Sequence, residues 1–306
     1  MRPWFIGIIA AALFLPTTQA ADPDFTRKED VIYGRKFGVA LTMDVFTPKK
    51  DANGAGIIHC VSGGFFSAKE AINPAFIAEF LKRGYTVFAV VHGSQPRFSI
   101  PEILDDMHRA TRYIRFHAKQ YGIDPERIGI TGGSAGGHLS LMQGVGGKDG
   151  DANAKDPVDR ASSRVQAVAC FFPASDFLNY GKEGEIALGT GTLGGFKAPF
   201  DFIEFNSKTR SFDRVTDEEK RKEIGKRISP VYFVTEKSPP MLIIHGDADK
   251  LVPIQQAELM IEKLKANKVP CELVVKPGAA HGWPKLLEDT KILADWFDKY
   301  LTKKKE

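Results

Sequence analysis

Short apolar runs without alternation recur along the chain and are separated by longer amphipathic stretches. The runs are rich in Val and Ile and stand at 56–61, 86–91, 127–131, 165–171, 241–245 and 272–276. A strand with one solvent face alternates apolar and polar residues, whereas a strand buried on both faces does not. The runs therefore predict a mostly parallel sheet. Before them, segments 31–33 and 41–46 flank Gly34 and Gly38, which predicts an N-terminal hairpin.

Helical periodicity fills the intervals between these runs. Apolar residues recur at three- or four-residue spacing in three sets: Ile103, Met107, Ala110 and Ile114; Ile254, Ala257, Ile261 and Leu264; and Ile292, Trp296, Phe297 and Tyr300. Parallel strands need long crossover connections, which are usually helices. The fold class predicted is α/β, with a doubly wound sheet.

One connection is far longer than the others. Connections in compact α/β units are normally about 2 to 6 residues, yet the segment between the runs ending at 171 and beginning at 241 is many times longer. It is rich in phenylalanine and ends in a charged helix-like piece at 217–227. Long insertions often carry function, so we expect a cap-like insertion at about 176–236, over the C-terminal edge of the sheet. The alternative is that its aromatic residues only fill a local core.

The strongest local motif is G-x-S-x-G, formed by Gly132, Ser134 and Gly136. It follows a predicted strand and precedes a helix-compatible segment, which is the context of a nucleophile elbow. A serine on such a tight turn has strained backbone geometry, and small neighbours let the strand and helix approach each other. The turn also places the serine at a helix N-terminus, which favours developing negative charge.

A serine hydroxyl needs a base and an orienting carboxylate to become a nucleophile. His281 lies in a loop of small residues after the last predicted strand. Asp247 and Asp249 lie on the loop after the preceding one, and Asp176 follows the strand before that. The order serine, acid, histidine along the chain is that of the α/β-hydrolases.

On these motifs the chain resembles the α/β-hydrolase superfamily, and it is similar to secreted bacterial esterases of the BD-FAE, acetyl-esterase and hormone-sensitive-lipase-like type. The resemblance runs from about Val31 to Leu301. It implies the α/β-hydrolase fold and places the acid at the second aspartate of H-G-D-x-D, which is Asp249, with Asp247 bracing the turn. Asp176 stays open as an alternative.

The same resemblance implies an oxyanion hole in the loop after the third strand. Relatives carry H-G-G-G or H-G-G-x-W there, whereas this chain has Ser62 at the histidine position, followed by Gly63 and Gly64. We expect the backbone N–H groups of Gly63, Gly64 and Ala135 to stabilise the oxyanion, each such donor being worth roughly 10² to 10³ in rate. The missing histidine puts the bracing of the loop in doubt. A simple glycine turn is the alternative.

Charge and cysteine content exclude several classes of protein. The chain has 42 basic and 38 acidic residues with no long basic block, which argues against nucleic-acid binding. Its three cysteines are an odd number within or beside apolar runs, so no disulfide framework is expected. The histidines are far apart and no zinc motif occurs, so neither a metal nor an organic cofactor is expected.

The N-terminal segment resembles a signal for export. Arg2 precedes an apolar run at 4–15, which is followed by Pro16 and small residues at 18 and 20. We interpret 1–20 as a cleavable signal peptide and 21–306 as one hydrolase domain, secreted or periplasmic. The apolar run is shorter than the roughly 20 residues of a spanning helix, so no stable membrane anchor is expected.

The expected function is a serine carboxylester hydrolase with Ser134 as nucleophile, His281 as base and Asp249 as acid. The resemblance favours acetyl or feruloyl-type esters of polysaccharides as substrates. One alternative is a prolyl-oligopeptidase-like serine peptidase, which would use the same triad order. Another is a non-catalytic hydrolase-like binding protein.

Overall fold

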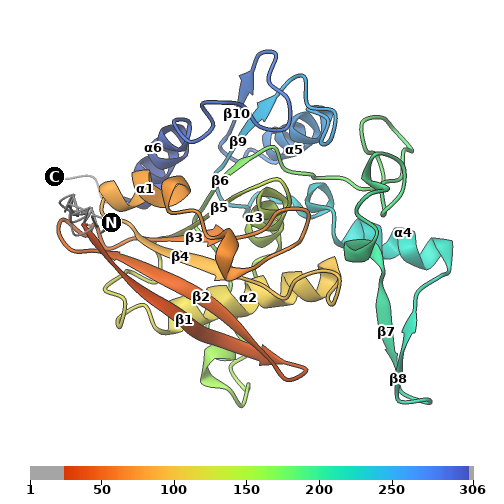
Figure 1. Cartoon of the computed structure of the whole chain (residues 1–306), viewed down its shortest axis with the longest axis horizontal. Coiled ribbons are helices and arrows are strands. Elements are labelled where there is room, and N and C mark those ends of the chain that lie inside the picture. Colours follow the sequence, from red (N-terminus) through yellow and green to blue (C-terminus); the bar gives the residue numbers. More distant parts are fainter. Residues whose placement is uncertain (1–23, 303–306) are drawn as a thin grey trace, which may run out of the picture.

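The computed structural model describes residues 24–302, so the predicted signal peptide at 1–20 lies outside the described residues. A twisted sheet of eight strands forms the middle of the molecule, in the order β1-β2-β4-β3-β5-β6-β9-β10 (Figure 1). The first two strands are β1 (Phe25–Lys36) and β2 (Val39–Pro48), which pair antiparallel as the predicted hairpin. Strand β2 pairs antiparallel with β4, and all further pairs are parallel.

The parallel strands coincide closely with the apolar runs. They are β3 (Gly56–Cys60), β4 (Thr86–Val91), β5 (Ile128–Gly133), β6 (Ala167–Phe171), β9 (Met241–Gly246) and β10 (Cys271–Lys276). All except β10 are almost wholly buried, as continuous apolar patterns require. Strand β10 is half-exposed, because it is the edge of the sheet. The expectation of burial on both faces was wrong there.

Five helices cover the two faces of the sheet. α1 (Pro74–Lys82) and α6 (Thr290–Leu301) pack on one face, where Phe80 contacts Phe297. α2 (Ile100–Phe116), α3 (Ala135–Gly146) and α5 (Gln255–Ala266) pack on the other. The predicted stripes on α2 and α5 are buried, while on α6 the buried stripe includes Leu293 and Ala294 rather than Ile292 and Tyr300. The doubly wound α/β class is confirmed.

The connection from β6 to β9 contains several short elements. In chain order these are the 3-10 turns Gly191–Leu193 and Ala198–Phe200, the strands β7 (Ile203–Asn206) and β8 (Ser211–Arg214), α4 (Glu218–Arg227) and the 3-10 turn Pro230–Phe233. Strands β7 and β8 form a separate hairpin that projects from the body on the right of Figure 1. The sequence analysis did not anticipate this hairpin. We use "the insertion" for residues 176–236.

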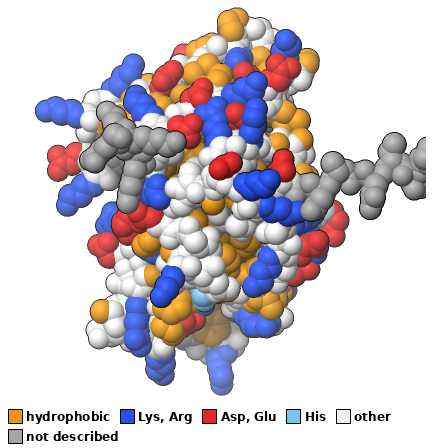
Figure 2. All heavy atoms as spheres, turned by 90° about the vertical axis from the view of Figure 1, so that its left-hand side faces the viewer, with side chains coloured by type: hydrophobic (Ala, Val, Ile, Leu, Met, Phe, Trp, Pro, Cys, Tyr) orange, Lys and Arg blue, Asp and Glu red, His pale blue; other side chains and the backbone are white. Residues whose placement is uncertain are grey.

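The surface carries interspersed charges of both signs. Figure 2 shows one face, where basic and acidic side chains alternate without a large patch of either sign. This agrees with the small net charge of +4. A nucleic-acid-binding face normally needs a basic stripe or cluster, which this view does not contain.

Candidate active site

Ser134 lies on the sharp turn between β5 and α3. Its backbone has φ 54° and ψ −118°, a conformation that L residues rarely adopt. A Cβ atom on Gly132 would lie 2.6 Å from the backbone of Gly136, and one on Gly136 would lie 2.7 Å from the Cys60 carbonyl oxygen. Both glycines are therefore required for the close approach of strand and helix. The local geometry is that of the predicted nucleophile elbow.

Three loops at the carboxyl ends of β5, β9 and β10 bring Ser134, Asp249 and His281 together. His281 Nε2 lies 2.9 Å from Ser134 Oγ, and His281 Nδ1 lies 2.6 Å from Asp249 Oδ2. A carboxylate only accepts hydrogen bonds, so Nδ1 carries the hydrogen and the Nε2 lone pair faces the serine hydroxyl. The Asp249 side chain is fully buried and that of His281 is 22% exposed. This arrangement can remove a proton from Ser134.

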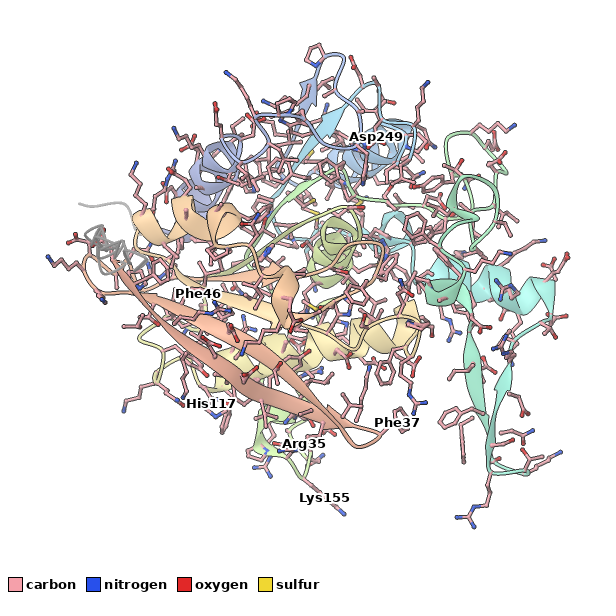
Figure 3. The ribbon with its side chains drawn as sticks, viewed as in Figure 1. Arg35, Phe37, Phe46, His117, Lys155 and Asp249 are labelled. Atoms are coloured by element: carbon pink, nitrogen blue, oxygen red, sulfur yellow. The ribbon has the colours of Figure 1, made fainter. Side chains whose placement is uncertain are left out.

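The Asp249 carboxylate is held in place from several sides. Its Oδ1 accepts hydrogen bonds from the Leu251 and Val252 amides, each at 2.9 Å. Burial alone would raise the pKa of Asp249, but hydrogen bonds from His245, His281 and the Val252 amide outweigh it and lower the pKa below its ordinary value. Figure 3 labels Asp249 at the end of β9, beside α5. The acid is therefore ionised at neutral pH.

The two alternative acids have other partners. Asp247 Oδ1 accepts the Gly278 amide at 2.6 Å, so this side chain ties the β9 loop to the loop that leads to His281. Both Asp176 oxygens bind the Tyr232 hydroxyl, at 3.1 and 3.0 Å, and the Leu178 amide also binds Oδ1. Asp176 thus braces the insertion. Of the three candidates, Asp249 is the one placed against His281.

The loop after β3 differs from the expected oxyanion hole in one donor. The Gly63 amide donates to the Phe66 carbonyl at 3.0 Å, within a tight turn that Phe66 closes by donating back to Gly63. The prediction that Gly63 is a free donor was wrong, because its N–H is already used in the turn. Gly64 and Ala135 instead border the cavity beside Ser134. These two residues remain as candidate donors.

A small apolar cavity opens beside Ser134. Its volume is about 40 Å³, and most of its walls are aromatic or aliphatic. The body of the fold contributes Phe65, Ala174, Leu251 and Val252, and the insertion contributes Phe177, Tyr180, Leu193, Phe196 and Phe200. The insertion therefore covers this part of the sheet edge with half-buried and buried rings. Phe205 and Phe212, which are 59% and 51% exposed on the β7–β8 hairpin, take no part in the cavity.

Comparison with known proteins identifies the family to which the chain belongs. The BD-FAE family model matches residues 43–264, which is more than two thirds of the chain and includes Ser134 and Asp249. The chain belongs to the BD-FAE family. The sequence resemblance to this type is confirmed, as is the α/β-hydrolase fold.

Relatives of the family include esterases from several sources. The chain is 27% identical over 265 residues to the probable carboxylic ester hydrolase LipM of Mycobacterium tuberculosis, which covers 85% of this chain and 57% of LipM. It is 27% identical to the esterase LipC of the same organism, over 85% of this chain and 60% of LipC. The chain thus spans somewhat over half the length of these curated relatives.

Solved structures agree over almost the whole fold. A truncated carbohydrate esterase from gut microbiota has a TM-score of 0.72 and 29% identity, and the match covers 91% of this chain and 98% of that one. Esterase 2 of Thermogutta terrifontis has a TM-score of 0.68 and 26% identity, with 93% and 96% covered.

In this BD-FAE member, Ser62 stands at the motif's histidine position in the loop after β3, and it forms a hydrogen-bonded pair with His92. His92, at the end of β4, has Nδ1 2.8 Å from the Gly93 carbonyl, so Nδ1 carries the hydrogen and Nε2 accepts from the Ser62 hydroxyl, also at 2.8 Å. Burial lowers the pKa of His92 to about 4, so the ring stays neutral. The loop is therefore braced from the neighbouring strand, which answers the doubt about its bracing that the missing histidine raised.

Several other residues acquire roles that the sequence did not reveal. Phe172, with a positive φ of 34°, packs its ring 4.5 Å from the His281 ring, between centroids. Trp283 packs on Phe171 and Phe172 and donates to Asp289, which favours core packing over a pocket role. The only sequence signal for the Phe172 contact was its place, as an aromatic residue, directly after a predicted strand.

Neither a metal site nor a membrane span is found among residues 24–302. The described chain contains no group of three or more His, Cys, Asp or Glu side chains placed to hold a metal ion. Over the same range, no helix is both long and apolar enough to cross a bilayer. The three cysteines, Cys60, Cys170 and Cys271, are free thiols.

Proposed function

We propose that the protein is a serine carboxylester hydrolase with Ser134 as nucleophile, His281 as general base and acid, and Asp249 as orienting carboxylate. The observation that supports it most is the continuous chain of contacts from Ser134 Oγ through the imidazole of His281 to Asp249 Oδ2, at 2.9 and 2.6 Å. The names of the related proteins, which are mostly esterases, support the same class of reaction.

In the proposed reaction, His281 Nε2 takes the Ser134 proton while Oγ attacks the ester carbonyl carbon. Negative charge then develops on the carbonyl oxygen, where the N–H groups of Gly64 and Ala135 would stabilise it. The imidazolium returns its proton to the leaving alcohol as the C–O bond breaks, which leaves an acyl group on Ser134. Water, activated by the same imidazole, then releases the acid and restores the serine.

The size of the cavity supports a short acyl group. A water molecule needs about 10–15 Å³ of such space, so the cavity of about 40 Å³ has room for only a few heavy atoms. An acetyl or propionyl chain fits, whereas a feruloyl ring does not without displacement of the surrounding rings. Of the two acyl classes expected from the sequence, the short one is therefore the proposed substrate.

The alcohol side of the substrate is proposed to be a carbohydrate. One structural neighbour is described as a carbohydrate esterase.

For the acyl side of the substrate, another related esterase structure holds propionate, which agrees in size with the cavity here.

The test is hydrolysis of chromogenic substrates by purified protein. We expect p-nitrophenyl acetate to be turned over faster than p-nitrophenyl octanoate, and methyl ferulate and a chromogenic dipeptide to react slowly or not at all. Peptide cleavage without ester turnover would favour the peptidase alternative. No reaction with any ester would favour a binding protein.

Export of the protein is also proposed, on the basis of residues 1–20 alone. Expression of the full chain in a bacterial host should give a mature form that begins near residue 21, in the periplasm or medium. N-terminal sequencing of that form tests the cleavage site.

A further inference from the structure

His245 lies on the side of Asp249 opposite to its catalytic partner. It is the fifth residue of β9, its side chain is fully buried, and it stands four residues before Asp249. The turn after β9 folds the chain back so that the carboxylate lies beside this imidazole. The contacts of His245 give it a specific role.

The direct contact is between His245 Nε2 and the oxygen of Asp249 that binds His281. Nε2 lies 2.8 Å from the Val252 carbonyl oxygen and 3.4 Å from Asp249 Oδ2. Because a carbonyl oxygen only accepts, Nε2 carries a hydrogen and donates it to the Val252 carbonyl, while the same nitrogen lies beside Oδ2. Asp249 Oδ2 thus lies between two imidazole N–H groups, with His281 Nδ1 at 2.6 Å and His245 Nε2 at 3.4 Å.

A second contact acts through the backbone of the loop after β9, which carries Asp249 and Val252. Val252 accepts the His245 hydrogen bond at its carbonyl and donates its own amide to Asp249 Oδ1 at 2.9 Å. The position of the Val252 peptide therefore depends on His245, and the position of Oδ1 depends on Val252. Both carboxylate oxygens are linked to the same buried ring.

The polar contacts of His245 are confined to this loop. Among the described residues, its Nδ1 is a buried nitrogen without a hydrogen-bond partner. Leaving a buried polar atom unpaired is costly, and a leucine would fill the same space without that cost. What a leucine cannot replace is the hydrogen bond from Nε2 to the Val252 carbonyl.

We propose that His245 is a positioning residue that fixes the Asp249 carboxylate against His281. It does so through the hydrogen bond of its Nε2–H to the Val252 carbonyl, and through the closeness of Nε2 to Oδ2. This inference rests on the proposed function, because it assigns a role within the same triad. It adds a fourth side chain to the three that the motifs indicate.

The test uses substitutions that differ in where they place an N–H. His245→Gln puts an amide N–H near the position of Nε2, His245→Asn puts it near Nδ1, and His245→Leu removes it. We expect kcat to fall roughly 10- to 100-fold for the Asn and Leu variants, as for loss of a hydrogen bond to a charged group, with KM nearly unchanged. The Gln variant should recover most of the rate.

His59→Leu is the matched control. His59 is a buried histidine of β3 whose ring stacks on Phe76, with an unpaired Nδ1 like that of His245. Its replacement should leave kcat near the value of the unaltered protein. If His245→Asn and His245→Gln retain equal rates close to that of His59→Leu, the positioning role is wrong. The Gln and Asn pair decides the question even if the leucine variant does not fold.

Coupling to Asp249 separates positioning from a general structural effect. If His245 acts through Asp249, the His245→Asn change should cost little in an Asp249→Asn background, because the carboxylate that it positions is already gone. A full additional loss in that background would overturn the proposal.

A readout independent of ester turnover separates this inference from the proposed function. A related esterase is phosphorylated by paraoxon, and intact-mass measurement would follow such a modification here, with Ser134→Ala as the control for its site. The His245→Asn variant should be labelled at least tenfold more slowly than His245→Gln, by the same hydrogen-bond argument. Equal labelling rates would overturn the positioning role. Labelling that follows this order in a protein that turns over no ester would refute the proposed function alone.

Discussion

The catalytic edge of the sheet and the insertion are built differently. At the edge, Ser134, Asp249 and His281 stand on short loops, and their polar atoms are linked by hydrogen bonds of 2.6 to 2.9 Å. The insertion, in contrast, includes the two-stranded β7–β8 hairpin, where the rings of Phe205 and Phe212 are exposed. At the edge, hydrogen bonds hold the polar atoms of the proposed triad in place. The hairpin of the insertion instead exposes aromatic rings to solvent.

The insertion itself has an inner and an outer part. Its inner part, 177–200, lines the cavity beside Ser134 with buried and half-buried apolar residues. Its outer part, 203–214, contacts the N-terminal hairpin, where the Phe37 and Phe212 rings lie 5.7 Å apart between centroids. Figure 3 labels Phe37 at the tip of that hairpin, well away from Asp249. Mutations at the catalytic edge, in the inner insertion and in the outer insertion should therefore have different effects. The first should change the rate of reaction, the second the preference for acyl groups, and the third neither.

The largest effect is expected from removal of the nucleophile. Ser134→Ala should lower kcat by about 10⁶, as when a catalytic serine is removed from a comparable triad. Steady-state kinetics on p-nitrophenyl acetate measures the loss, and an unchanged melting temperature shows that the elbow still folds. Residual turnover near the original rate would mean that the edge of the sheet is not the reactive region.

The next largest effect is expected at the acid. Asp249→Asn should lower kcat by about 10⁴, because an amide in place of the carboxylate favours the wrong tautomer of His281. Asp176→Asn is the matched control from the insertion, since its carboxylate binds Tyr232 instead of the triad. Comparable losses in both variants would remove the distinction between the two regions.

The sequence predicted the catalytic edge well for a physical reason. In a parallel sheet the carboxyl ends of all strands lie on one edge, so residues just after the strands, such as Ser134 and His281, converge whatever their separation along the chain. The glycine spacing around Ser134 also has one steric interpretation, which the structure confirms at Gly132 and Gly136.

The features that the sequence did not reveal depend on contacts that leave no recognisable motif or periodicity in the sequence. The engagement of the Gly63 amide depends on how the turn to Phe66 closes, and the contact of His245 with Asp249 depends on the path of the β9 loop. The β7–β8 hairpin was missed because its strands have four residues each and expose their phenylalanines. Short exposed strands carry little hydrophobic periodicity.

Acid should destabilise the body of the fold, because buried histidines lie in and around the sheet while the insertion has none. Burial lowers the pKa of four histidines from 6.5 to about 4, namely His59, His92, His108 and His138. Below pH 6.5 the unfolded chain binds more protons than the folded one, so stability falls as the pH drops from 6.5 towards 4. The cost should be about 1–2 kcal/mol for each histidine at pH 5.

Denaturant melts between pH 7 and 5 measure this slope. The pKa values of Asp105 and Asp106, which burial raises, oppose the trend, but they are two groups against four. His59→Leu should flatten the pH dependence, and Phe205→Ser, which is on the hairpin, should not. A stability that does not change over this range would show that these rings are protonated without penalty.

Selectivity should change when the inner insertion is altered. Leu193 lines the cavity, so Leu193→Ala should enlarge it and raise the ratio of kcat/KM for butyrate over acetate esters by roughly tenfold, the usual worth of about one methylene in an apolar pocket. Glu183→Ala, at an exposed position of the insertion, is the control. An equal loss on both esters would indicate damage to the catalytic edge rather than a change in cavity size.

The smallest effect is expected from the outer hairpin. Phe205→Ser and Phe212→Ser replace exposed rings that take no part in the cavity, and surface substitutions usually change stability by no more than about 0.5 kcal/mol. Turnover of p-nitrophenyl acetate should stay within about twofold of the original, because these rings lie outside the cavity beside Ser134 and a twofold change is only about 0.4 kcal/mol of activation free energy. Phe116→Ser, an exposed ring at the end of α2, gives the matched comparison. If the hairpin variants lose activity on this small ester while Phe116→Ser does not, the hairpin contributes to catalysis, and the separation between the catalytic edge and the outer insertion fails.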